Sequence, residues 1–177
     1  GDLGKFGNYG KALDIDGDFL VVGAPYHNNF IGAGYVYQLN SENGNWELHS
    51  VLSPPEGQKK DVVGCCVSIS GNFIALGATG DDTHGINTGA VYLYQLIEDE
   101  WVLARKLTAG DSTNFGGAPD QFGSAVRLEG DILVVGAKGR DIIQKVRNSG
   151  QLFVFQKDKD GLNNWGLRST MTTDDAN

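Results

Sequence analysis

The chain has 177 residues, of which 40% are hydrophobic and 26 are glycines, so it can bury one sizeable core and contains many tight turns. Its formal net charge of -8 would repel a phosphate backbone, and no cluster of Lys and Arg stands out, so nucleic acid is not an expected partner. The apolar runs are far shorter than the roughly 20 residues of a membrane-spanning helix, so we expect no membrane insertion in this segment.

One nine-residue phrase occurs three times along the chain. The copies are "GDFLVVGAP" (17–25), "GNFIALGAT" (71–79) and "GDILVVGAK" (130–138). The segments on either side repeat as well. The unit therefore consists of four apolar segments of strand length, and it occurs three times, which indicates a repeat architecture.

The first segment of each unit precedes the phrase. The three copies are "YGKALDI" (9–15), "VGCCVSI" (63–69) and "FGSAVRL" (122–128). Apolar and polar residues alternate at its end, as in Leu13 and Ile15 against Asp14 and Asp16, which predicts a strand with one buried face. A Gly and then Asp or Asn follow, and this order favours a type II′ hairpin turn because its first central position has positive φ.

The remaining three segments also read as strands. The second, "FLVV", "FIAL" or "ILVV", is apolar on both faces and should be sandwiched between neighbouring layers, and the Gly-Ala pair that ends it permits close backbone approach. The third (32–38, 89–95 and 150–156) supplies paired aromatic rings to fill the space between sheets. The fourth (46–52, 101–107 and 165–171) begins with Trp and alternates like an outer strand with one wet face.

Repeats of four antiparallel strands at this spacing are typical of propeller blades. We therefore predict an all-β fold in which residues 1–177 form one partial β-propeller with blades at 9–62, 63–121 and 122–177. Propellers hold about 4 to 8 blades, so further blades should come from the same or another chain.

The strings "YGKALDIDGDFLVVGAP" and "FGSAVRLEGDILVVGAK" resemble FG-GAP repeats, the units of the seven-bladed propeller in integrin α chains and related surface proteins. The resemblance covers residues 9–171. Tyr9 and Val63 stand where the family has Phe, and Thr79 and Lys138 replace its Pro. The resemblance implies a larger, about seven-bladed ring and an extracellular or cell-surface location. The chain begins with Gly1 and no signal-like stretch follows, so we expect a processed protein or a piece of one.

The resemblance also raises calcium, because many FG-GAP blades carry an acidic loop between the first two strands. Asp14, Asp16 and Asp18 are the residues to consider. Calcium takes about 6 to 8 oxygen ligands, which a two-residue turn cannot supply. We therefore expect these carboxylates to line a solvated strand face, and we expect no metal or cofactor.

Cys65 and Cys66 are the only cysteines, and they are adjacent on the first strand of the second unit. Neighbouring strand residues point to opposite faces, so we expect two buried or half-buried free thiols rather than a redox or metal pair. The sequence contains no G-x-S-x-G, Walker or H-E-x-x-H pattern, and we expect the protein not to be an enzyme.

The connections between the second and third strands differ between units in length and chemistry, as the loops of a binding surface do on a constant scaffold. The alternative is that the fold simply tolerates variation in these loops and that they bind nothing. Every blade runs in the same sense, so these connections should share one rim. The candidate binding residues are Tyr26, His27, Asn28, Asn29 and Phe30 in the first unit, Asp81, Asp82 and His84 in the second, and Arg140, Asp141, Lys145 and Arg147 in the third.

These observations favour a non-enzymatic β-propeller module for adhesion, assembly or extracellular scaffolding, which binds a protein or glycan partner through the loops. The best single candidate is "GRDIIQKVRNS" of the third unit, because it places cations beside aliphatic residues. The alternative is a propeller hydrolase or a lectin-like glycan-binding domain whose site needs the missing blades.

Overall fold

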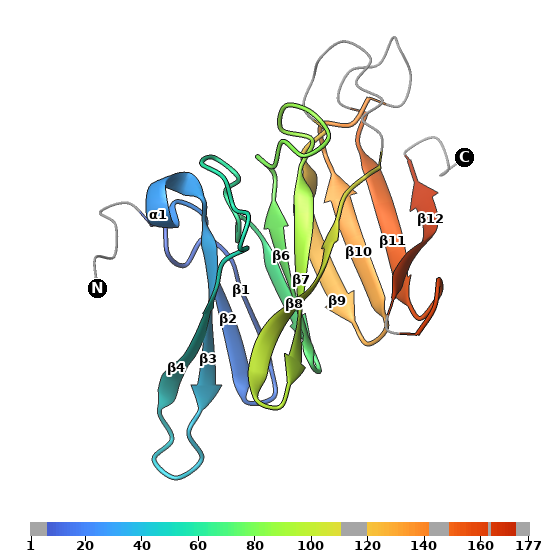
Figure 1. The fold of residues 1–177 in the computed structure, drawn as a ribbon. Coiled ribbons are helices and arrows are strands. Elements are labelled where there is room, and N and C mark those ends of the chain that lie inside the picture. Colours follow the sequence, from blue (N-terminus) through green and yellow to red (C-terminus); the bar gives the residue numbers. More distant parts are fainter. Residues whose placement is uncertain (1–6, 111–119, 142–148, 163, 173–177) are drawn as a thin grey trace.

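A computed structural model describes residues 7–110, 120–141, 149–162 and 164–172. It contains twelve strands in three four-stranded antiparallel sheets, and the strands of each sheet follow one another in chain order. The sheets stand side by side from the N-terminal to the C-terminal side of the molecule (Figure 1). The all-β architecture of three propeller blades is confirmed.

We call the sheets blade 1, blade 2 and blade 3. Blade 1 consists of β1 (Leu13–Asp16), β2 (Phe19–Ala24), β3 (Ala33–Leu39) and β4 (Trp46–Leu52), with a single turn α1 (His27–Phe30) between β2 and β3. Blade 2 consists of β5 (Val67–Ser70), β6 (Phe73–Ala78), β7 (Ala90–Ile97) and β8 (Glu100–Leu107). Blade 3 consists of β9 (Phe122–Glu129), β10 (Ile132–Ala137), β11 (Gln151–Lys157) and β12 (Trp165–Met171).

A two-residue hairpin joins the first two strands of every blade. The φ angles of Gly17, Gly71 and Gly130 are 55°, 54° and 53°, and the Asp or Asn that follows each of them is not among the residues with positive φ. Positive φ at the first central residue alone is the mark of a type II′ turn. The predicted turn is confirmed.

The hydrophobic core lies between the blades. One cluster joins blades 1 and 2 and includes Val21, Val36, Ile69 and Leu76, and a second joins blades 2 and 3. β6 is buried along its whole length because each of its faces meets a neighbouring blade. β6 is therefore buried between two neighbouring blades, as the sequence predicts for the second strand.

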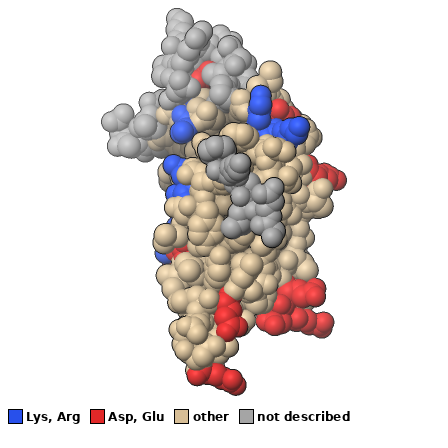
Figure 2. All heavy atoms as spheres, turned by 90° about the vertical axis from the view of Figure 1, so that its left-hand side faces the viewer, with Lys and Arg blue, Asp and Glu red and all other residues tan. Residues whose placement is uncertain are grey.

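Blade 1 departs from the predicted burial pattern. Leu13 and Ile15 are 67% and 55% exposed, whereas Ile69 and Leu128 at the place of Ile15 are buried. The reason is that the face of blade 1 equivalent to these buried faces has no blade of the described chain against it. Figure 2 views the molecule from this side: the described residues at the centre of the surface are uncharged, acidic residues gather toward its lower end, and basic residues lie higher up.

Backbone insertion joins each blade to the next. A Cβ atom on Gly23 or Gly77 would overlap the carbonyl oxygen of Gly64 or Gly123 from the following blade. Single parallel bridges, Gly32 to Val63 and Gly89 to Phe122, bind the same segments. The following blade thus inserts an apolar-Gly dipeptide, Val63–Gly64 or Phe122–Gly123, against the Gly-Ala end of the preceding second strand. This is the close approach that the Gly-Ala pairs predict.

Candidate functional site

The connections between the second and third strands lie at the same end of the three blades (Figure 1). Their described parts place Tyr26, His27, Asn28, Asn29 and Phe30 on blade 1, Asp81, Asp82 and His84 on blade 2, and Arg140 and Asp141 on blade 3. Lys145 and Arg147, and with them most of the "GRDIIQKVRNS" insert, lie outside the described residues. We call this end the rim.

The rim of blade 1 is aromatic and exposed. The rings of Tyr26 and Phe30 lie 4.8 Å apart between centroids, and both side chains face solvent. Asn28, Asn29 and Phe30 have positive φ, so α1 is a tight left-handed turn rather than a regular helix. This turn brings residues 26 and 30 together. The sequence predicts both residues as binding candidates, but it does not predict that their rings lie in contact.

Two further interactions support this turn. His27 Nδ1 shares a hydrogen bond of 3.1 Å with the Tyr35 hydroxyl, and the two rings meet edge to face. Tyr9 packs edge-on against Tyr35 and donates a hydrogen bond of 3.0 Å from its hydroxyl to that of Tyr37. Tyr9 stands where the family has Phe, and the sequence does not predict these contacts. The added hydroxyl allows Tyr9 to extend the aromatic surface.

The rim of blade 2 is held by a buried ion pair. Asp81 Oδ2 lies 2.7 Å from Lys106 Nζ and accepts a hydrogen bond of 2.8 Å from the Tyr92 hydroxyl. Burial opposes the charge of Asp81, but hydrogen bonds from Lys106, Thr83 and Tyr92 outweigh burial, so the pKa of Asp81 lies below its ordinary value. The Asp81 carboxylate therefore fastens the loop to its own blade.

The other two candidates of blade 2 are exposed. Asp82 accepts a hydrogen bond of 2.6 Å from the backbone N–H of Asn87, and His84 lies at the surface of the same loop. Asp82 thus shapes the loop, and both side chains are open to a partner.

The rim of blade 3 repeats the internal ion pair with other residues. Arg140 Nη1 lies 3.0 Å from Asp120 Oδ2, and its guanidinium stands over the ring of Phe153, 5.4 Å from the centroid. Asp141 is buried as well. Burial raises the pKa of Asp120, although the charge of Arg140 acts in the opposite direction. Arg140 and Asp141 therefore lie inside the rim rather than on its surface.

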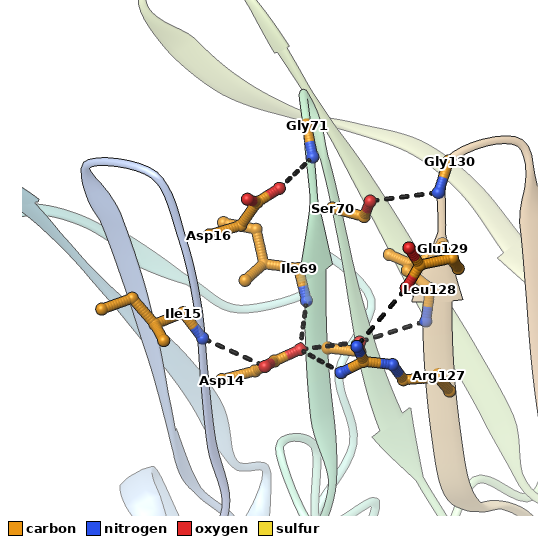
Figure 3. Close-up of polar contacts among 11 residues, drawn as sticks. Asp14, Ile15, Asp16, Ile69, Ser70, Gly71, Arg127, Leu128, Glu129 and Gly130 are labelled. Carbon is orange, nitrogen blue, oxygen red and sulfur yellow. Dashed lines mark hydrogen bonds and ion pairs between the residues drawn. The ribbon is translucent and has the colours of Figure 1, made fainter.

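Of the three aspartates considered for calcium, Asp14 and Asp16 lie on β1, and Asp18 lies in the turn between β1 and β2. Asp14 Oδ2 accepts hydrogen bonds from Ser68 Oγ (2.8 Å) and from the N–H of Ile69 (3.0 Å), both in blade 2 (Figure 3). Asp16 accepts one of 2.6 Å from the N–H of Gly71. The prediction of a solvated strand face is wrong for Asp14, because its half-buried carboxylate binds the next blade.

Blade 2 repeats this arrangement toward blade 3. Ser68 Oγ accepts a hydrogen bond of 3.1 Å from the N–H of Leu128, and Ser70 Oγ accepts one of 3.1 Å from the N–H of Gly130 (Figure 3). Arg127 reaches back to Asp14 at 3.5 Å. The side chains at these two positions of the first strand are thus acceptors for the following blade. Among the described residues, no group of three or more His, Cys, Asp or Glu could hold a metal ion.

Cys65 and Cys66 are free and half-buried, as expected. The prediction that they point to opposite faces is wrong, because β5 begins only at Val67 and both cysteines lie in the bend before it. Their Sγ atoms approach the same acceptor, the carbonyl oxygen of Gly123, at 3.6 and 2.9 Å. The neighbouring thiol of Cys66 lowers the pKa of Cys65 below its ordinary value, although burial acts in the opposite direction.

Comparison with known proteins agrees with this architecture. The family model described as FG-GAP repeat matches residues 46–94 and 101–155. No curated protein matches the chain. Among solved structures, the crystal structure of the Saccharomyces cerevisiae Sqt1 is similar over 94% of this chain and 36% of that chain, with a TM-score of 0.56 and 11% sequence identity. At this identity the likeness concerns the fold alone, and the chain spans about a third of that structure's length.

Proposed function

Because this chain belongs to the FG-GAP repeat family and folds into β-propeller blades, we propose that it is a non-enzymatic interaction module for adhesion, assembly or extracellular scaffolding. FG-GAP repeats are typical of extracellular proteins, which supports an extracellular or cell-surface location. In the described part of the chain, no helix has the length and hydropathy to cross a membrane. The partner is a protein or a glycan, bound at the rim.

The observation that carries this proposal is the exposed contact between Tyr26 and Phe30. Aromatic residues bury a large area at little cost in side-chain entropy, and they dominate the energetics of many interfaces. The left-handed turn of α1 fixes these two rings before a partner arrives. Such preorganisation lowers the entropy lost on binding.

The alternative is a hydrolase or a lectin-like domain with a site completed by further blades. Asp81 and Arg140 are the strongest acidic and basic candidates of the rim, and each forms an ion pair within the chain, Asp81 with Lys106 and Arg140 with Asp120. This arrangement favours a structural role for both residues over proton transfer to a substrate. A lectin-like role would still use the aromatic rim, because the CH faces of sugars pack on aromatic rings.

The test applies the labelled chain to an array of defined glycans and to a panel of purified extracellular matrix proteins. We expect Tyr26→Ser and Phe30→Asn to weaken the binding of any captured probe at least about tenfold, as hot-spot substitutions do. Asn is chosen at position 30 because it tolerates the φ of 67° found there. Ile97→Ser is the matched control, because Ile97 is an exposed apolar residue at the end of β7, away from the rim.

The melting temperature of each variant separates loss of a contact from loss of the fold. If the variants still bind, Tyr26 and Phe30 are not part of the binding surface. If the wild-type chain binds neither the glycans nor the matrix proteins, the proposed partner classes are wrong. Cleavage of the arrayed glycans would replace the proposal by the hydrolase alternative.

A further inference from the structure

The outer face of blade 3 contains a hollow of about 420 Å³. It lies between the start of β9, the end of β10 and the start of β11, and its walls include Gly136, Ala137, Gly150 and Leu152. These wall positions have counterparts in the other two blades. Gly136 stands at the place of Gly23 and Gly77, and Gly150 at the place of Gly32 and Gly89.

In the other two blades, this place is filled by the next blade. A Cβ atom on Gly32 or Gly89 would overlap backbone atoms of Val63 or Phe122, the apolar residue of the inserted dipeptide. In blade 3, a Cβ atom on Gly136 would first meet Ala125 Cβ of its own blade at 3.4 Å, and one on Gly150 would find its nearest described neighbour at 3.8 Å. The hollow therefore has the form of a socket for an apolar-Gly dipeptide, and no described residue fills it.

The other end of the molecule presents such a dipeptide. Tyr9–Gly10 stands at the place of Val63–Gly64 and Phe122–Gly123, and Tyr9 is exposed whereas Val63 and Phe122 are fully buried. The φ of Gly10 is 88°, close to 83° at Gly64 and 84° at Gly123. The segment thus has the backbone conformation of the two inserted dipeptides without being inserted.

The apolar residues beside Tyr9–Gly10 are exposed, as Tyr9 is. Leu13, Ile15 and Trp46 are exposed, and they occupy the places that in blades 2 and 3 pack against the preceding blade. Where Figure 2 draws described residues at the centre of this face, they are uncharged. An apolar face of this kind fits another apolar face rather than water.

We propose that the hollow of blade 3 is a binding site for the Tyr9–Gly10 segment of a second copy of this chain. The contact repeats the junction that the chain already makes twice, between blades 1 and 2 and between blades 2 and 3. A closed pair of two 177-residue copies, joined head to tail at both ends, would contain six blades, which lies within the range of about 4 to 8 blades that propellers hold. This inference is independent of the partner proposed for the rim.

The polar groups of the innermost strands fit the same contact. Glu129 stands at the place of Asp16 and Ser70, whose side chains accept the N–H of the glycine in the next hairpin, so it can accept the N–H of Gly17 from the second copy. Arg127 stands at the place of Asp14 and Ser68 and cannot accept a hydrogen bond. The N–H group that would face Arg127 belongs to Ile15 of the second copy, which stands at the place of Ile69 and Leu128. This N–H needs no acceptor in the neighbouring copy, because it donates to the side chain of Asp14 in its own blade.

The test measures the mass of the 177-residue chain by sedimentation over a range of concentrations. We expect a reversible dimer. Gly136→Ala should weaken association at least about tenfold, because the added methyl group finds an ordinary contact in the single chain but blocks an incoming carbonyl. Ile15→Glu acts at the opposite end and should weaken it as strongly, since Ile15 is exposed in the single chain and buried in the proposed contact. Ile86→Ser, remote from both ends, should leave association unchanged.

A photoreactive benzoylphenylalanine at position 9 identifies the surface that is touched. Crosslinks to Gln151 or Leu152 of another copy support the head-to-tail contact, whereas crosslinks to another copy's β1 or β4 overturn it in favour of two blade 1 faces meeting. A monomer at every concentration overturns the proposal, and so does association that survives Ile15→Glu. That second variant keeps the test decisive if Gly136→Ala disturbs folding.

Discussion

Phe19 lies edge-on against Trp101, with ring centroids 5.5 Å apart, across the junction between blades 1 and 2. Phe73 meets Trp165 in the same way across the next junction, at 5.3 Å. The first residue of a second strand therefore packs on the Trp at the start of the fourth strand of the following blade, which is its first or second residue. Trp46 has no such partner among the described residues, and it is 39% exposed where Trp101 and Trp165 are 8% and 2% exposed.

This difference predicts unequal costs for one substitution at equivalent positions. Trp165→Ala should lower the free energy of unfolding by about 3 to 5 kcal/mol, because it leaves a large cavity beside Phe73. Trp46→Ala should cost less than about 1 kcal/mol in the single chain. Urea denaturation at the lowest workable protein concentration, at which blade 1 stays uncovered, measures both values. Equal losses of unfolding free energy would show that the tryptophans stabilise their own sheets rather than the junctions between blades.

The hydrogen bonds of Figure 3 predict a second contrast. Ser68 is buried, and its hydroxyl bridges Asp14 and the N–H of Leu128. Ser68→Ala leaves a buried N–H without an acceptor, which should cost about 1 to 3 kcal/mol of stability. Ser70→Ala removes the corresponding bond to Gly130 at an exposed site, where water replaces the hydroxyl, and should cost about 0.5 kcal/mol or less.

Thermal and urea unfolding of both serine variants provide the measurement. The prediction fails if Ser70→Ala destabilises the chain as much as Ser68→Ala does. Leu128 amide hydrogen exchange gives an independent readout, and it should accelerate in Ser68→Ala only.

The repeat made most of the fold predictable, because each strand carries a local signal three times over. Gly17, Gly71 and Gly130 specify the same turn by their freedom at positive φ. The exposure of Leu13 and Ile15 was not predictable in this way. Alternation reveals that one face of a strand is apolar, but it does not reveal whether another blade covers that face.

The candidate site was predictable only in outline. Loop variation locates the rim, and the aromatic contact between Tyr26 and Phe30 lies on it. The burial of Asp81 depends on Lys106, which lies 25 residues further on in an outer strand, and no local pattern links the two. Long-range ion pairs of this kind convert a charged loop residue from a binding candidate into a structural one.

Asp81 and Asp61 should influence acid stability in opposite directions. The pKa of Asp81 is lowered in the folded chain, so its stabilising contribution is present above the ordinary Asp value and is lost as the pH falls through the folded pKa. We therefore expect the stability difference between the wild type and Asp81→Asn to be largest near neutral pH and to shrink in acid.

Burial raises the pKa of Asp61, and the hydrogen bond from the Gln58 N–H only partly offsets it. The contribution of Asp61 is therefore present below the ordinary Asp value and is lost as the pH rises through the folded pKa. Relative to the wild type, Asp61→Asn should gain stability as the pH rises from acid to neutral. Unfolding free energies of both variants across this range, at fixed salt, are the measurement, and parallel pH profiles would contradict the opposite signs.

The thiol of Cys65 should be the reactive one of the adjacent pair. Its lowered pKa arises mainly from the neighbouring thiol of Cys66, and Thr79 adds smaller contributions in the same direction. An ordinary thiol has a pKa near 8.5 and is only a few per cent thiolate at neutral pH, so a lowered pKa gives Cys65 a larger thiolate fraction. We expect Cys66→Ala to slow alkylation of Cys65 by iodoacetamide at neutral pH several-fold, and Thr79→Val to slow it less.

The rate is followed by mass spectrometry over a pH series, with Cys65→Ala as the control that removes the modified site. If Cys66→Ala left the midpoint of that series in place, the shifted pKa would have to come from a cause other than the neighbouring thiol.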